Sequence, residues 1–146
     1  MLALIQRVSS ASVDVDEITV GKIDRGILLL LGIQKTDEEY LVEKLVNKVL
    51  NYRIFGDDKG HMNLSLKDIK GSLLIVPQFT IAADTKKGSR PSFSSAMQPD
   101  IAEALYNQFV SCAEAGFPNV ATGKFGADMK VSLLNDGPVT FMLEVN

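Results

Sequence analysis

Apolar positions in the first third of the chain recur at the spacing of β-strands. Four strands are predicted, at residues 2–8, 11–15, 18–20 and 27–33. Alternation with period two across the second strand predicts one solvated face. The last strand is apolar on both faces, which is typical of a strand at the centre of a sheet. Ser9 to Ala11 is predicted as a tight connection, and such short links favour an antiparallel meander over βαβ units.

Two later segments carry the apolar spacing of amphipathic helices. The first stripe runs from Leu41 to Val49, and Thr36 with Glu39 fits a capping box, so this helix is predicted to begin at Thr36. The second helix is predicted from about Pro99 to Ala115, because Pro99 suits a first turn. Its buried stripe is predicted to comprise Ile101, Leu105, Phe109 and Cys112.

The remaining apolar runs predict more strands and complete the fold class. Leu73 to Val76 predicts a short strand buried on both faces, and residues 53–55 another. Residues 130–134 and 139–145 predict two strands joined by a turn at 135–138. We therefore expect an α+β fold, a single domain over residues 1–146 with a mainly antiparallel, barrel-like β core and two principal helices.

Composition narrows the functional classes. The chain has 146 residues, 46% of them hydrophobic, which is enough for a core and too many for disorder. A net charge of −3 argues against a protein that grips long nucleic acid, DNA included, through its whole surface. A local basic patch that holds one end of an RNA stays compatible with it. One cysteine, no signal pattern and no long apolar run predict a cytoplasmic protein without a membrane segment.

Polar side chains follow the buried strand at residues 73–76. Gln78 and Thr80 would share a face in an extended chain, with Phe79 pointing the other way. A polar pair at the mouth of a buried strand is a candidate ligand site. A strand that simply surfaces and turns polar is the alternative.

Two other groups of residues are candidates for a chemical role. His61 is the only histidine and lacks partners for a zinc site or a triad, so we interpret it as a surface residue and expect neither metal nor cofactor. The loop at 84–93 carries Lys86, Lys87 and Arg90. These cations would neutralise one or two phosphates of a bound RNA, or belong to a solvated loop.

Two motifs, Gln78-Phe79-Thr80 and Asn135-Asp136-Gly137-Pro138-Val139-Thr140, resemble those of the D-aminoacyl-tRNA deacylase family. The similarity extends along the chain, through Ile5-Gln6-Arg7-Val8, Arg53-Ile54-Phe55, Met62-Asn63-Leu64-Ser65, Arg90-Pro91-Ser92-Phe93 and Phe125-Gly126-Ala127-Asp128-Met129. Two positions depart from the family pattern: Pro77 stands where serine is common, and Ile81 where leucine is.

The resemblance implies hydrolysis of the ester that joins a D-amino acid, or glycine, to the 3′ end of tRNA. It implies a homodimer with sites at the subunit interface. It also implies a cis bond at Gly137-Pro138, whose carbonyls enter the partner's site and exclude an L side chain. From composition alone, residues 135–138 favour an ordinary trans-proline hairpin turn.

The residues are compatible with this chemistry. An aminoacyl ester is already labile, so an enzyme mainly orients water and stabilises an oxyanion. Backbone N–H groups at Phe79 and Thr80 suit that role, and we expect Thr80 to position rather than attack. Assistance by the terminal ribose hydroxyl of the tRNA is the family-level alternative. The rival hypotheses are a non-catalytic module that binds RNA ends or nucleotides, and a plain acyl hydrolase acting through Thr80.

Overall fold

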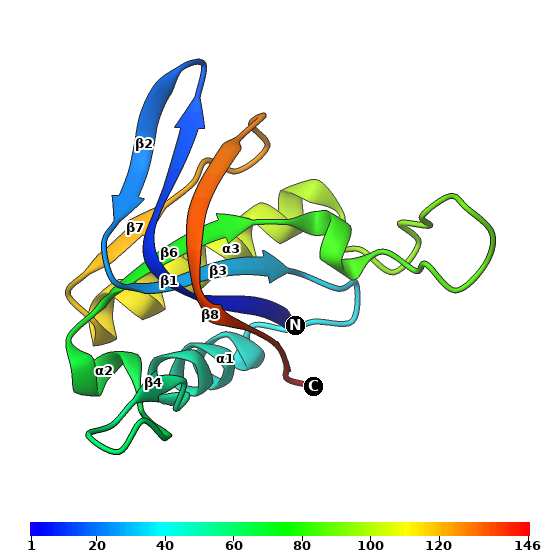
Figure 1. Ribbon diagram of the computed structural model, residues 1–146. Helices are drawn as coiled ribbons and strands as arrows, with labels where there is room; N and C mark the ends of the chain where they lie inside the picture. Colours follow the sequence, from blue (N-terminus) through cyan, green and yellow to red (C-terminus); the bar gives the residue numbers. More distant parts are fainter.

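The computed structural model describes all of residues 1–146 (Figure 1). The strands are β1 (Leu2–Val15), β2 (Ile18–Ile23), β3 (Gly26–Gly32), β4 (Phe55–Gly56), β5 (Met62–Leu64), β6 (Ser72–Pro77), β7 (Val120–Thr122) and β8 (Lys130–Glu144). The helices are α1 (Tyr40–Asn51), α2 (Leu66–Ile69), the 3-10 helix η1 (Phe79–Ala82) and α3 (Pro99–Gly116). The two longest helices are the two that the sequence predicts.

Six of the strands form one sheet in the order β2-β1-β3-β6-β7, and β8 pairs with the other edge of β1. The pairs β3–β6 and β6–β7 are parallel, so the sheet is mixed, whereas all pairs that involve β1 are antiparallel. The sheet curls until β2 approaches β7, and a Cβ added to Gly21 would collide with the carbonyl oxygen of Thr122. Glycine at this position lets the curled sheet nearly close, which confirms the predicted α+β fold with a barrel-like core.

Alternate residues of the central strands feed two separate hydrophobic clusters. In β3, Leu29 belongs to the larger cluster, which includes the buried residues of α1 and α3. Its neighbour Leu28 belongs to the smaller cluster on the opposite face, together with Leu74 of β6. Both strands are therefore buried on both faces, as their continuous apolar runs predict.

The predicted break between residues 8 and 11 is wrong, because β1 is one strand of 14 residues. Its first half pairs with β3 and its second half with β2. The register with β8 shifts between Val8 and Ser10, which is the signature of a bulge. The extra residue lets Val8 and Ala11 face the same cluster. The exposed serines mark this bulge and not a turn, so β1, β2 and β3 do not form a simple meander.

The predicted turn at residues 135–138 is also wrong as a hairpin. β8 is a single strand of 15 residues that follows β1 from end to end. Its register jumps opposite Arg7, where Gln6 pairs with Thr140 and Val8 already pairs with Asn135. Residues 136–139 therefore bulge out of a continuous strand. We call this segment the β8 bulge.

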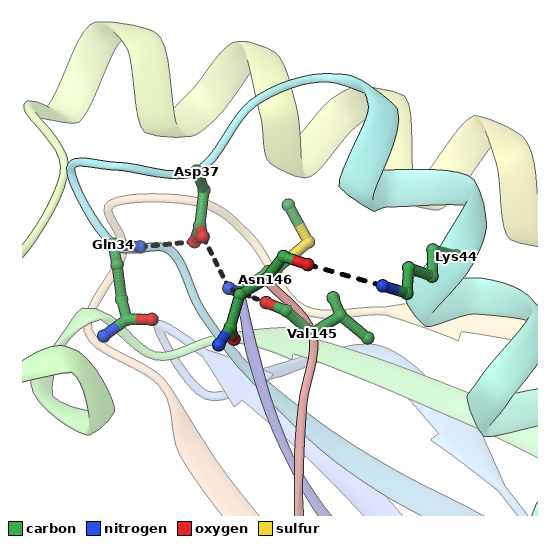
Figure 2. A network of polar contacts seen from close by, with 6 residues as sticks. Gln34, Asp37, Lys44, Val145 and Asn146 are labelled. Atoms are coloured by element: carbon green, nitrogen blue, oxygen red, sulfur yellow. Dashed lines mark hydrogen bonds and ion pairs between the residues drawn. The ribbon is translucent and has the colours of Figure 1, made fainter.

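The predicted capping box at Thr36 does not form, because α1 begins at Tyr40 and has no side-chain cap. The buried carboxylate of Asp37 instead accepts hydrogen bonds from the Met1 ammonium, at 2.5 Å, and from the Gln34 amide, at 2.7 Å. The ammonium also donates to the carbonyl of Val145, so the two ends of the chain meet here (Figure 2). Met1 lies 36 residues away from Asp37 in sequence, so the local pattern carries no sign of this contact.

The helix α3 agrees with the prediction in its bounds but differs in its face. Leu105 and Phe109 are buried, whereas Ile101 is 48% exposed and Cys112 is only half-buried. The buried face passes instead through Ala102, Tyr106 and Ala113. None of the helices is both long enough and apolar enough to cross a membrane.

Candidate active site

The end of β6 places Gln78 and Thr80 side by side through a tight turn. Pro77 still pairs with Leu31 of β3, and the Gln78 amide donates to the Leu31 carbonyl at 2.8 Å. The chain then turns into η1, so the expected extended geometry of residues 78–80 is wrong. Nevertheless Gln78 Nε2 donates to Thr80 Oγ1 at 2.5 Å. The hydroxyl of Thr80 is thus held by the neighbouring amide and is exposed to solvent.

A cavity of about 440 Å³ opens beside this polar pair. Its walls are mostly apolar and come from β3, β6, α3 and the segment 125–129. Gln78 and Phe79 lie at its lining, together with Pro77. An apolar pocket with a few polar groups at its edge is the usual form of a small-molecule site. Of the three predicted residues, Gln78 and Phe79 line this concave surface and Thr80 does not, an arrangement compatible with the predicted ligand site.

Two aromatic residues that the sequence analysis did not assign to a site also line this cavity. The ring centroids of Tyr106 and Phe125 lie 5.7 Å apart. Burial raises the pKa of the Tyr106 hydroxyl to about 12, so it stays neutral near pH 7. Two features of the sequence point to these residues. Tyr106 lies on the face of the helix next to the predicted buried stripe, and Phe125 lies in a segment that resembles the deacylase family.

The β8 bulge presents Gly137 and Pro138 to solvent. Their peptide bond is cis, and Gly137 has a φ of +141°, which side chains of L residues rarely adopt. Arg7 links the bulge to another part of the chain. Its Nε donates to the Asp136 carbonyl at 2.9 Å, and its Nη1 donates to the Ile54 carbonyl at 2.7 Å. The bulge is therefore attached to a second, distant segment of the chain.

A second set of hydrogen bonds closes the β8 bulge from its two ends. Asn135 Oδ1 accepts from the Val139 amide at 2.9 Å, and Asn135 Nδ2 donates to Thr140 Oγ1 at 3.0 Å. Gln6 Nε2 donates to the same hydroxyl at 3.3 Å. These contacts, with those of Arg7, fix the positions of the backbone carbonyls in the bulge.

The two motifs do not meet within one chain. Gly137 and Pro138 do not line the cavity beside Gln78. In the sheet, β1 and β3 lie between β8 and β6. The β8 bulge also stands opposite Arg7, which pairs with Ile27, whereas Gln78 bonds to Leu31.

The three predicted cations lie on a loop that projects from the body of the molecule just after η1 (Figure 1). Two backbone hydrogen bonds between Asp84 and Ser92, of 2.8 and 2.9 Å, close the base of this loop. Lys86, Lys87 and Arg90 are all exposed, and none forms an ion pair.

The other candidate groups lie elsewhere. His61 is exposed directly after the turn at residues 58–60, as expected of a surface residue. No group of three or more histidine, cysteine or acidic side chains is arranged to hold a metal ion. Burial, and then the charge of Glu43, raise the pKa of the Cys112 thiol, which makes the thiolate less available.

Comparison with known proteins agrees with these motifs. A family model described as D-Tyr-tRNA(Tyr) deacylase matches residues 4–144. A relative from Teredinibacter turnerae, named D-aminoacyl-tRNA deacylase, is 60% identical over 144 residues and covers 99% of both chains. One of the same name from Cellvibrio japonicus is 59% identical over 146 residues and covers 100% of both.

Solved structures show the same fold. A protein described as c-Myc DNA Unwinding Element Binding Protein superposes with a TM-score of 0.96 at 41% identity, covering 100% of this chain and 99% of that one. A probable eukaryotic D-amino acid tRNA deacylase superposes with a TM-score of 0.85 at 17% identity over 99% of this chain and 98% of its own, a likeness of fold alone. The match over residues 4–144, together with the two motifs, means that this chain belongs to the D-Tyr-tRNA(Tyr) deacylase family.

Proposed function

We propose that this chain hydrolyses the ester bond of D-aminoacyl-tRNA and releases the free amino acid and tRNA. The observation that carries the proposal is the Gln78–Thr80 pair at the mouth of the apolar cavity, in a chain whose close relatives are named D-aminoacyl-tRNA deacylases. Residues 1–146 act as one domain in the cytoplasm, and no cofactor takes part. The acylated 3′ end of the tRNA is the substrate, and DNA is not a partner.

Hydrolysis needs a positioned water and a stabilised oxyanion. Water attacks the ester carbonyl carbon, the bond to the ribose oxygen breaks, and that oxygen takes up a proton as the hydroxyl of the tRNA end. Phe79 and Thr80 lie in the first turn of η1. The backbone N–H groups at the start of a helix have no acceptor within the helix. They donate to the developing oxyanion in this proposal. The hydroxyl of Thr80, held by Gln78, orients the water or the substrate.

Selection against L-amino acids is assigned to the β8 bulge. Its backbone carbonyls at Gly137 and Pro138 occupy the space that an L side chain would need, so discrimination works by clash. A wall of this kind cannot reject glycine, which has no side chain. We therefore propose that glycyl-tRNA is also hydrolysed.

The separation of the two motifs within one chain supports a homodimer. The β8 bulge of one subunit would reach the Gln78–Thr80 pair of its partner and complete that site. β8 offers a suitable surface, because its second edge has no strand partner and because Leu133, Leu134 and Met142 of this strand are exposed. Long apolar edges of this kind are normally covered in stable proteins.

A deacylation assay with one tRNA charged with a D-amino acid, the L-amino acid or glycine tests the proposal. We expect turnover of the D and glycyl substrates and at least a hundredfold lower kcat/KM for the L substrate. Tight binding of the charged tRNA without turnover would favour the rival, a non-catalytic module that binds RNA ends. Turnover of simple esters, with no preference for the tRNA, would favour a plain acyl hydrolase.

A further inference from the structure

Two exposed aromatic side chains form a pair at the base of the loop at residues 84–93, which carries Lys86, Lys87 and Arg90. Phe79 is 61% exposed and Phe93 is 43% exposed, although both are large apolar groups. Their ring centroids lie 5.1 Å apart, with an angle of 53° between the planes. Each ring supports the other, and neither belongs to the two hydrophobic clusters of the fold.

Backbone hydrogen bonds hold the main chain that carries both rings. Phe79 opens η1, in which the Ile81 amide donates to the Gln78 carbonyl and the Ala83 amide to the Thr80 carbonyl. Phe93 follows Ser92, which is bonded to Asp84, and its own carbonyl accepts from the Ala96 amide at 3.0 Å. The exposed rings are thus preorganised and do not sit on a loose tail.

Charge and position restrict what this surface can bind. The cations Lys86, Lys87 and Arg90 lie on the loop that begins and ends beside the ring pair, in a chain whose net charge is −3. A polyanion is therefore attracted to this part of the molecule more than to the rest. Exposed aromatic faces beside unpaired cations are the combination that binds single-stranded nucleic acid, because bases stack on the rings while cations contact the phosphates.

We infer that the Phe79–Phe93 pair is a stacking platform for the unpaired nucleotides that precede the terminal adenosine of the tRNA. This inference rests on the proposed function and names a part of the substrate that the cavity leaves unbound. The acylated end lies at Gln78 and Thr80, the next bases stack on the rings, and the phosphates run toward Lys86, Lys87 and Arg90.

The test compares two substrates of different length. One is D-aminoacyl adenosine, which has no upstream nucleotide, and the other is the D-aminoacylated full tRNA. We expect Phe93→Ala to lower the ratio of their kcat/KM values, tRNA over adenosine, by about tenfold, since stacking on one ring is lost. Phe93→Tyr should restore the ratio, and Phe93→Leu should not, because leucine keeps apolar surface but has no aromatic face. The matched control is Tyr40→Ala, which removes a ring that is 65% exposed on another surface.

Equal losses on both substrates would overturn the inference, because the ring would then only support the catalytic segment. An unchanged ratio would overturn it as well. A change in oligomeric state on size-exclusion chromatography would assign Phe93 to a subunit interface and would also contradict it.

A binding measurement separates this inference from the proposed function. The probe is an uncharged RNA hairpin that ends in a single-stranded CCA, compared with the same hairpin trimmed to a blunt end. We expect Phe93→Ala to weaken binding of the overhang by about tenfold and to leave the blunt hairpin unaffected. If no D-aminoacyl ester is hydrolysed but this difference is found, the platform stands and the proposed function falls.

Discussion

Arg7 Nε donates a hydrogen bond of 2.9 Å to the main-chain carbonyl of Asp136, and so ties β1 to the β8 bulge. The same guanidinium reaches the Ile54 carbonyl at 2.7 Å through Nη1. An arginine can serve both acceptors at once because its donors form a rigid fork. The side chain is 18% exposed, and its bond to Ile54 is partly buried whereas its bond to Asp136 lies at the surface.

Arg7→Lys should therefore weaken both stability and selectivity. Lysine keeps the charge but cannot bridge the two carbonyls, and each lost charged hydrogen bond costs about 1–3 kcal/mol. We expect urea unfolding to report a loss of about 2 kcal/mol and deacylation assays to report a lower ratio of D over L turnover. The exposed Arg53→Lys is the control. A destabilised variant that keeps its full D over L ratio would show that Arg7 supports the fold alone.

Thr80→Ala should lower the rate of deacylation but leave measurable residual activity. The hydroxyl is held by Gln78 and is assigned a positioning role, whereas the oxyanion donors are backbone groups that the substitution retains. We expect kcat/KM to fall by roughly ten- to a hundredfold, and Thr80→Ser to stay close to the unsubstituted protein. Complete loss in Thr80→Ala, with an acyl group trapped on Thr80 of the unsubstituted enzyme by mass spectrometry, would establish a covalent role instead.

Gly137→Ala should damage chiral discrimination. A Cβ at this position would lie 3.0 Å from the Val139 amide nitrogen and 2.6 Å from Val139 Cγ2, at a φ of +141° that alanine disfavours. The backbone of the β8 bulge must then move. We expect the ratio of kcat/KM for D over L substrate to fall at least tenfold in steady-state assays, and a variant with both rates unchanged would remove the bulge from the site.

Asp37→Asn should destabilise the protein strongly. The carboxylate and the Met1 ammonium are almost fully buried, and removing one partner leaves the other charge without compensation. We expect a loss of about 3–5 kcal/mol in the free energy of unfolding, measured by denaturant titration. Asp58→Asn, at an exposed turn, is the matched control and should change the value by less than about 0.5 kcal/mol.

Neutralising Lys86, Lys87 and Arg90 to glutamine should weaken tRNA binding and reduce its salt dependence. The slope of log K against log salt is expected to be about −1 to −3 for the unsubstituted protein, since only a few phosphates are contacted. The triple variant should lose most of that slope in filter-binding or fluorescence titrations. Neutralisation of the exposed Lys22, Lys59 and Lys67 is the control. Unchanged binding by the loop variant would mean that these cations are merely solvated.

Elements that depend on local pattern were predictable, and those that depend on a distant partner were not. The strands β3 and β6 are continuous apolar runs buried on both faces, and the stripe from Leu41 to Val49 is buried in α1 as its spacing predicts. The bulges in β1 and β8 have the polar composition of turns, and only the pairing of the two strands with each other keeps each one continuous. Thr36 and Glu39 fit a capping box locally, and no local pattern indicates that Asp37 binds Met1, which is 36 residues away.

The same distinction holds for the site. Gln78 and Phe79 form a motif directly after a buried strand, and both residues line the cavity. The predicted extended conformation of residues 78–80 is wrong, because the last bond to β3 is made by the Gln78 amide and the 3-10 turn begins at Phe79. Tyr106 and Phe125 reach the cavity from α3 and from a loop. Only tertiary packing brings those residues together.

The pairing of β1 with β8 also has a consequence for how the chain folds. Leu2 pairs with Glu144 and Asp14 with Lys130. The first strand therefore cannot complete its pairing until the last strand is available. Contacts between the two ends of a chain slow folding, because loop closure precedes the gain from pairing. During synthesis on a ribosome the early β1, β2 and β3 segments emerge long before their partner does. Until residue 144 leaves the exit tunnel, β1 has one edge without its final neighbour, and this nascent species is the one most exposed to chaperones and to misassembly.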